Sequence, residues 1–285
     1  ANYRGGDDFT ESLDQVKKHA RLATALDPTL AEPYAALGLA LREHRHYLEA
    51  REALATALKL EPNDVTTNFW QATLLVTTGY MREGNAALDR TLALDPMLPN
   101  ALLWRGRNHF YAGEVAAAER LLRQAESAGH SFVGIGIARL EAHRGDKAAA
   151  TQSLAKGFAN YFASDFPPEA PEVFARSIYG DAADRTKAHA MIDTYLATQP
   201  KVIPGIVPYV LIRSGQPDRG LVLAQDRPTS NDAMFESEMF RKNSEIAGAA
   251  AFPEFARRSG LAAVWDSAGP PDNCRKNDRG DYTCS

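Results

Sequence analysis

The chain has 285 residues, 45% of them hydrophobic, and carries a formal net charge of -4 with a pI near 6.0. This length is enough for one or two domains with full hydrophobic cores. The mild acidity offers no basic surface for phosphate backbones, and no run of about 18 apolar residues occurs. We therefore expect neither direct nucleic-acid contact nor a membrane-spanning segment in this chain.

A period of 34 residues runs through the first half of the sequence. Three Leu-acid-Pro triplets recur at this interval: Leu26-Asp27-Pro28, Leu60-Glu61-Pro62 and Leu94-Asp95-Pro96. Two further positions keep the period, one small (Gly38, Ala72, Gly106) and one apolar (Ala20, Leu54, Leu88, Leu122). Small and apolar residues at fixed places allow two helices to nest, so each period is expected to form one antiparallel helical hairpin.

In chain order, the period predicts a partial first repeat, three full repeats and one degenerate repeat. The partial repeat is a helix over 9–26 that corresponds to the second helix of a hairpin, so we expect a fragment of something larger. The full repeats cover 31–64, 65–98 and 99–132. The degenerate one keeps Gly145, Ala150 and Leu154 after a register slip of two residues.

The period is lost after Phe162, where Phe166-Pro167-Pro168-Glu169-Ala170-Pro171 is typical of a connecting loop. Short amphipathic helices are then predicted again, now without the 34-residue repeat. The segment from Pro208 to Leu221 resembles one more degenerate helical hairpin. We therefore expect a repeat array over 1–162 and an all-helical C-terminal extension over 163–285 that caps it.

Both cysteines, Cys274 and Cys284, lie in the last twelve residues. The segment between them is polar and rich in turn formers, so it closes easily into a loop. A disulfide would hold the C-terminus in place and imply an oxidising compartment, whereas two free thiols would fit a poorly ordered cytoplasmic tail. We expect the disulfide. A metal site is disfavoured because the last histidine is His189.

No motif in the sequence indicates catalysis. Gly134-Ile135-Gly136-Ile137 lacks the third glycine and the preceding strand of a phosphate loop, and we interpret it as a site of close helix packing. The sequence contains no Gly-x-Ser-x-Gly, His-Glu-x-x-His or Gly-Lys-Ser/Thr motif. We therefore expect a protein that is not an enzyme and binds no cofactor or metal.

The period, its small residues and the Pro that ends each unit resemble the tetratricopeptide repeat (TPR). The resemblance implies an all-α superhelix of helix-turn-helix units that binds a protein or peptide in a concave groove. The ligand-facing family positions fall here on Leu39, Arg42, Phe69, Thr73, Val76, Leu103, Arg107, Phe110 and Arg139. Exposed aromatics and arginines suit a peptide ligand. The alternative is that Phe69 and Phe110 are buried against the extension, which then fills the groove.

The predicted groove differs from that of chaperone-binding TPR proteins. Those members grip a C-terminal carboxylate with a set of Lys and Asn residues. The corresponding positions hold Ala35, Leu39, Phe69 and Thr73. A chaperone adaptor is therefore disfavoured.

The tail, from Arg258 to Trp265 and from Gly269 to Cys274, is similar to the ending of a bacterial TPR subfamily: a Gly-Leu pair, a Trp, then Pro-Asp and a Cys. In that subfamily the array is the C-terminal half of CadC-like regulators, which carry a winged-helix DNA-binding domain and one transmembrane helix upstream, or of class III nucleotide cyclases. The resemblance implies a periplasmic sensing domain that acts through a change in arrangement or homodimerisation. The alternatives are a cytoplasmic regulatory or scaffold region of a cyclase, with free thiols, and a free-standing TPR adaptor.

Overall fold

The computed structural model describes residues 7–159, 166–200, 203–226, 229–230, 238–241 and 244–284. The chain divides into two compact units, residues 1–96 with 231–285 (unit 1) and residues 97–230 (unit 2). The boundary predicted between 162 and 163 falls within residues 160–165, outside the described part of the chain, and stays a prediction. Within the described part, no helix combines the length and the apolar character needed to cross a membrane.

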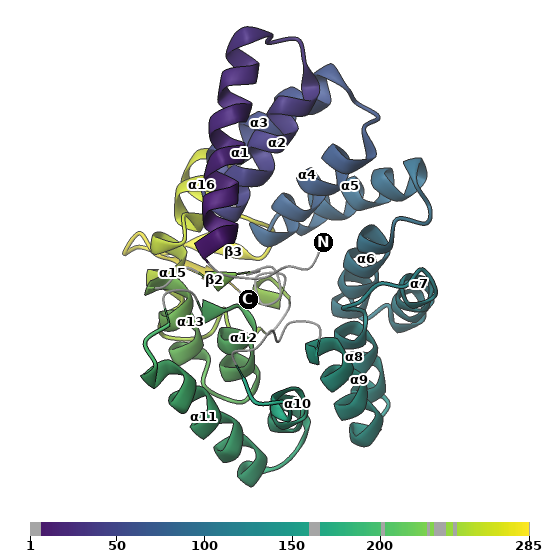
Figure 1. Cartoon of the computed structure of the whole chain (residues 1–285), viewed down its shortest axis with the longest axis vertical. Helices are drawn as coiled ribbons and strands as arrows, with labels where there is room; N and C mark the ends of the chain where they lie inside the picture. Colours follow the sequence, from purple (N-terminus) through teal and green to yellow (C-terminus); the bar gives the residue numbers. More distant parts are fainter. Residues whose placement is uncertain are drawn as a thin grey trace. The chain divides into compact units, whose positions relative to one another are not determined.

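Unit 1 begins with a single helix and two helical hairpins (Figure 1, purple to blue). These are α1 (Asp7–Leu26), α2 (Ala31–Glu43) with α3 (Tyr47–Leu60), and α4 (Val65–Thr77) with α5 (Met81–Leu94). Each Leu-acid-Pro triplet lies where α1, α3 or α5 ends, because proline lacks an amide hydrogen and disfavours helix in the residue before it. The helices predicted from the period over 9–94 are confirmed.

A close approach between two helices holds each of these hairpins together. A Cβ atom added to Gly38 on α2 would lie 2.6 Å from Cγ of Leu54 on α3. One added to Gly84 on α5 would lie 2.7 Å from Cγ2 of Val76 on α4. Carbon atoms that are not bonded pack at about 3.5–4.0 Å, so these positions have no room for a larger side chain.

The C-terminal part of unit 1 contains α15 (Phe252–Arg258), α16 (Leu261–Ala268) and an antiparallel hairpin of β3 (Cys274–Lys276) and β4 (Tyr282–Cys284). Cys274 lies opposite Cys284 in this hairpin, and the two form a disulfide. The expected disulfide is therefore present. The short strands were not predicted, because the segment that forms them is polar and shows no apolar alternation.

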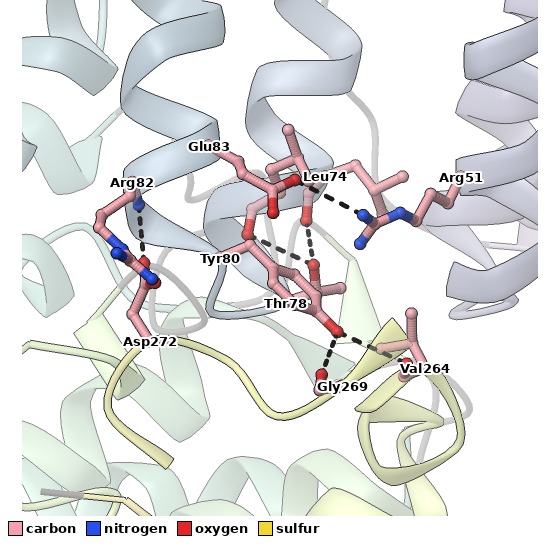
Figure 2. Close-up of polar contacts among 10 residues, drawn as sticks. Arg51, Leu74, Thr78, Tyr80, Arg82, Glu83, Val264, Gly269 and Asp272 are labelled. Atoms are coloured by element: carbon pink, nitrogen blue, oxygen red, sulfur yellow. Dashed lines mark hydrogen bonds and ion pairs between the residues drawn. The ribbon is translucent and has the colours of Figure 1, made fainter. Parts of the chain in front are cut away.

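Figure 2 shows how this C-terminal segment is held on the turn between α4 and α5. The Tyr80 hydroxyl donates a hydrogen bond to the Gly269 carbonyl at 2.7 Å. The backbone N–H and the Nε–H of Arg82 each donate to the carboxylate of Asp272 at 2.7 Å. Gly79, which precedes Tyr80 in this turn, has φ 90°, a backbone conformation that favours glycine.

Trp265 is the centre of this contact. It is fully buried, and its indole Nε1–H donates to the Thr78 carbonyl at 2.8 Å. Its ring packs edge-on against Phe240 and Tyr282, with ring centroids 5.9 Å and 4.9 Å away. The disulfide hairpin thus presents Tyr282 to the tryptophan, and this C-terminal segment lies on the turn between α4 and α5.

Unit 2 consists of four consecutive helical hairpins and one short parallel strand pair in its described residues (Figure 1, blue-green to green). The helices are α6 (Pro99–Tyr111) with α7 (Val115–Ser127), α8 (Gly134–His143) with α9 (Lys147–Ala159), α10 (Ala170–Tyr179) with α11 (Ala182–Ala197), and α12 (Ile206–Arg213) with α13 (Pro217–Asp226). The strands are β1 (Ile203–Pro204) and β2 (Thr229–Ser230).

The degenerate fourth repeat forms a complete hairpin, α8 with α9. Gly134 lies so close to the Ser153 carbonyl and to Gly157 that a Cβ atom there would collide with backbone. The glycine pair at 134 and 136 therefore serves helix packing, as the sequence predicted. The hairpin of α12 and α13 coincides with the segment from Pro208 to Leu221, for which the sequence predicted a degenerate hairpin.

Candidate functional site

The predicted groove residues lie on the first helices of successive hairpins, α2, α4, α6 and α8, and none of them is exposed. Four are buried, with exposed fractions of 1–8%: Thr73, Leu103, Arg107 and Arg139. Four are half-buried: Leu39, Arg42, Phe69 and Phe110. Val76 is also buried. The buried residues have little surface open to a partner, whereas the half-buried residues are the candidates for contact with one, and the groove itself stays a prediction.

The half-buried candidates of unit 1 lie on α2 and α4. Leu39 and Arg42 are on α2, and Arg42 forms an ion pair with the adjacent Glu43 at 3.2 Å. Phe69 on α4 is followed by Trp70, which is also half-buried and was not predicted. An aliphatic, an arginine and two aromatic side chains provide the residue types that dominate the energetics of protein interfaces.

In unit 2 the two predicted arginines belong to an arginine–tyrosine cluster: Arg107 and Tyr111 on α6, Arg139 on α8, Tyr179 on α10, and Tyr209 and Arg213 on α12. Arg139 donates from Nη2 to the Tyr209 hydroxyl at 3.0 Å, and its Cζ lies 5.5 Å from the Tyr111 ring centroid. Arg107 lies over the ring of Trp104 at 5.2 Å. Aromatic faces and phenol oxygens replace part of the hydration that a buried guanidinium loses.

The electrostatics of the cluster are dominated by its arginines. Burial alone raises the pKa of the Tyr209 phenol, but the positive charges of Arg139, Arg213 and Arg107 outweigh it, so the net pKa is lowered. Burial raises the pKa of Tyr179 to about 12. Tyr179 is therefore neutral at physiological pH, and the Tyr209 hydroxyl accepts the hydrogen bond from Arg139.

Helix α12 contacts the predicted groove residue Arg139 through Tyr209. Tyr209 belongs to α12 in the C-terminal extension, and its ring packs edge-on against Phe158 at 6.0 Å. The alternative considered from the sequence concerned Phe69 and Phe110, and it stays a prediction. Phe110 instead packs edge-on against Tyr111 and His143, at 6.0 Å and 5.9 Å.

A serine–histidine contact in unit 2 has the separation of a nucleophile and its base. His189 Nε2 lies 2.7 Å from Oγ of Ser214. Gln216 donates from its amide nitrogen to His189 Nδ1 at 3.2 Å, so the ring proton is on Nε2. The imidazole then donates to Ser214 and cannot accept its proton. Ser214 is also 4% exposed, which makes this pair a structural contact.

No other feature of the described residues indicates chemistry. They contain no group of three or more His, Cys, Asp or Glu side chains that could hold a metal ion. A cleft of about 700 Å³ between α9, α10 and α11 is lined by both signs of charge, including Lys147, Glu172, Arg176 and Asp184. Arg176 and Glu172 pair with each other at 2.7 Å across one helical turn.

Two solved structures share this fold. A tetratricopeptide repeat protein from Parabacteroides merdae ATCC 43184 gives a TM-score of 0.51 at 16% identity, over 88% of this chain and 94% of that chain. A chain of the APC/C hetero-tetramer Cut9-Hcn1 gives 0.54 at 13% identity, over 88% of this chain and 46% of that chain. No protein-family model and no curated protein sequence matches the chain. At these identities the likeness shows the fold alone, and it confirms the all-α, TPR-type array of hairpins.

We expect Arg139→Ala to lower the free energy of unfolding by about 2–4 kcal/mol, because it removes the bond to Tyr209 and leaves buried partners without their donor. The matched control is Arg120→Ala on the exposed side of α7, which should stay within about 0.5 kcal/mol of the wild type. Urea unfolding followed by circular dichroism measures both. Equal small effects would show that Arg139 does not support the fold.

Two histidines of unit 2 are held in the neutral form. His130 Nδ1 accepts from the Phe132 amide at 3.1 Å, and its Nε2 lies 2.8 Å from Oδ1 of Asn100. His189 makes the same kind of pair, as described above. Burial is the main reason that the pKa values of both histidines are lowered, and the charges of Arg107 and Arg219 lower them further.

A lowered histidine pKa makes stability depend on pH. The unfolded chain binds a proton near pH 6.5, whereas the folded chain resists it, so stability is fully present above pH 6.5 and decreases as the pH falls below it. We expect the double variant His130→Gln, His189→Gln to lose less stability than the wild type between pH 7.5 and pH 5. His143→Gln, at an exposed position, serves as control. Parallel profiles for all three proteins would contradict this assignment.

Proposed function

We propose that this chain is a protein-interaction and sensing domain that binds a protein or peptide partner and catalyses no reaction. The observation that carries the proposal is the TPR-type array of hairpins. One of the two similar structures, the Cut9-Hcn1 hetero-tetramer, is itself a protein assembly. Arrays of this kind present an extended surface built from successive first helices, on which side chains vary while the packing between helices is kept.

The half-buried residues of the predicted groove are the contact residues in this proposal. Leu39, Arg42 and Phe69 lie on adjacent first helices of unit 1, and Phe110 lies on α6 of unit 2. Partly covered aliphatic and aromatic groups still expose apolar surface, and a partner that covers it removes this area from water. The remaining predicted residues are buried within their own units, Thr73 in unit 1 and Leu103, Arg107 and Arg139 in unit 2, and in this proposal they support the helices that carry the contact residues.

We further propose that the domain belongs to a larger bacterial signalling or transcription-regulatory protein and works in the periplasm. The disulfide between Cys274 and Cys284 supports an oxidising compartment, and the tail from Gly260 to Cys274 supports the likeness to CadC-like regulators. The alternatives, a cytoplasmic region of a cyclase and a free-standing adaptor, fit free thiols better. Partner binding or homodimerisation would be the event that such a domain reports.

Site-specific photo-crosslinking tests the binding surface. We expect p-benzoylphenylalanine in place of Phe69 to crosslink a defined partner in cells of the source organism, identified by mass spectrometry. The same group in place of Ala86, exposed on the second helix α5, should not. With the purified partner, Phe69→Ala should weaken the Kd at least about tenfold, which corresponds to about 1.4 kcal/mol. Identical crosslinks from both positions, or no crosslink from Phe69, would contradict the proposal.

A further inference from the structure

The cleft of about 700 Å³ in unit 2 is bordered by short side chains on one helix and by an aromatic and an acidic residue on the next two. On α9 its lining includes Ala148, Thr151 and Ala155, which share one helix face because their spacings are three and four. Tyr179, the last residue of α10, and Asp184, in the first turn of α11, line the same cleft. The cleft therefore lies where α9 offers little side-chain volume towards α10 and α11.

Helix α3 of unit 1 corresponds to α9 and shows which side chain can stand at the position of Thr151. Both helices place a fully buried alanine at their fourth residue and a fully buried leucine at their eighth: Ala50 and Leu54 in α3, Ala150 and Leu154 in α9. The residue after the alanine is Arg51 in α3 and Thr151 in α9. A long cationic side chain in unit 1 thus has a short neutral counterpart in unit 2.

Arg51 lies between an aromatic ring and a carboxylate (Figure 2). Its guanidinium forms an ion pair with Glu83, in the first turn of α5, at 3.5 Å. Its Cζ lies 4.9 Å from the ring centroid of Tyr80, the residue before α5. A guanidinium suits such a place because its flat face stacks on a tyrosine ring while its N–H groups point at a carboxylate.

Arginine–carboxylate pairs join other neighbouring second helices in the two units as well. Arg21 of α1 pairs with Glu49 of α3 at 3.4 Å, and Arg219 of α13 pairs with Asp193 of α11. Between α9 and α11 the structure has a cleft, because Thr151 lacks the reach of an arginine. Exposed pairs of this kind contribute little to stability, so the fold tolerates the cleft.

We propose that the cleft binds an arginine side chain of a partner protein between Tyr179 and Asp184, by the same kind of contacts that Arg51 makes in unit 1. This contact would add to the protein-binding function proposed above. It belongs to unit 2 and does not depend on the surface at Phe69, so either proposal can fail without the other.

The remaining charges of the cleft narrow the chemistry of the partner. Lys147 and Lys156 line it on the side of α9, whereas Glu172 accepts two hydrogen bonds from Arg176, from Nε at 3.1 Å and from Nη2 at 2.7 Å. A segment that carries an acidic side chain next to its arginine matches both signs of charge in the cleft.

Ligand-detected saturation-transfer NMR on the full chain tests the proposal with the dipeptide N-acetyl-Arg-Glu-amide as probe. We expect saturation of the arginine protons that falls at least about fivefold when citrulline, which has a similar shape without the charge, replaces arginine in the probe. Asp184→Asn should reduce the signal in the same way. Thr151→Arg should abolish it, because the chain then fills the cleft with its own guanidinium, as it does at Arg51.

The matched control is Thr194→Arg, which adds the same charge at an exposed position of α11 and should keep the signal of the wild type. Asp184 also accepts a hydrogen bond from the Asp181 amide at the start of α11, whereas Thr151→Arg leaves this cap unchanged, so the test does not depend on how well Asp184→Asn folds. Equal signals from the arginine and citrulline probes, an unchanged signal in Thr151→Arg, or no signal from the wild type would overturn the proposal.

Discussion

The structure depends on how closely two helix backbones approach each other inside each hairpin. In each of the three full repeats, one glycine lies where the two helices come close: Gly38 against Leu54, Gly84 against Val76, and Gly106 against Leu122. Two helices can then bury their larger residues, such as Leu54 and Leu122, without a gap between them.

The second constraint is the return of the C-terminal segment to the hairpins of unit 1. Trp265, Gly269 and Asp272 meet the turn between α4 and α5, and the hydrogen bond from Tyr80 to Gly269 joins residues 189 positions apart (Figure 2). The disulfide closes the loop that presents Tyr282 to Trp265. Local order in the hairpins thus comes from neighbours in sequence, whereas the cap depends on contacts that close a very long loop.

The difference between local and long-range contacts explains which parts of the structure could be predicted from the sequence. The period predicted the hairpins and the small residues at positions 38, 72 and 106, because helix pairing inside a repeat is a local property. It also predicted which helices carry Arg107 and Arg139, but not that both would be buried. Their environment depends on Tyr209 and α12, and the contact from Arg139 to Tyr209 spans 70 residues without any period to reveal it. The contact between His189 and Ser214 was not predicted either, because it also joins residues that no period relates.

The substitution Gly38→Ala tests the central constraint most directly, through the free energy of unfolding measured in urea. Helix propensity alone would raise this free energy by about 0.5–1 kcal/mol. Close approach predicts the opposite sign, a decrease of about 1–3 kcal/mol, because the new Cβ would lie 2.6 Å from Cγ of the buried Leu54. A decrease would support the account, and an increase of the size that propensity gives would contradict it.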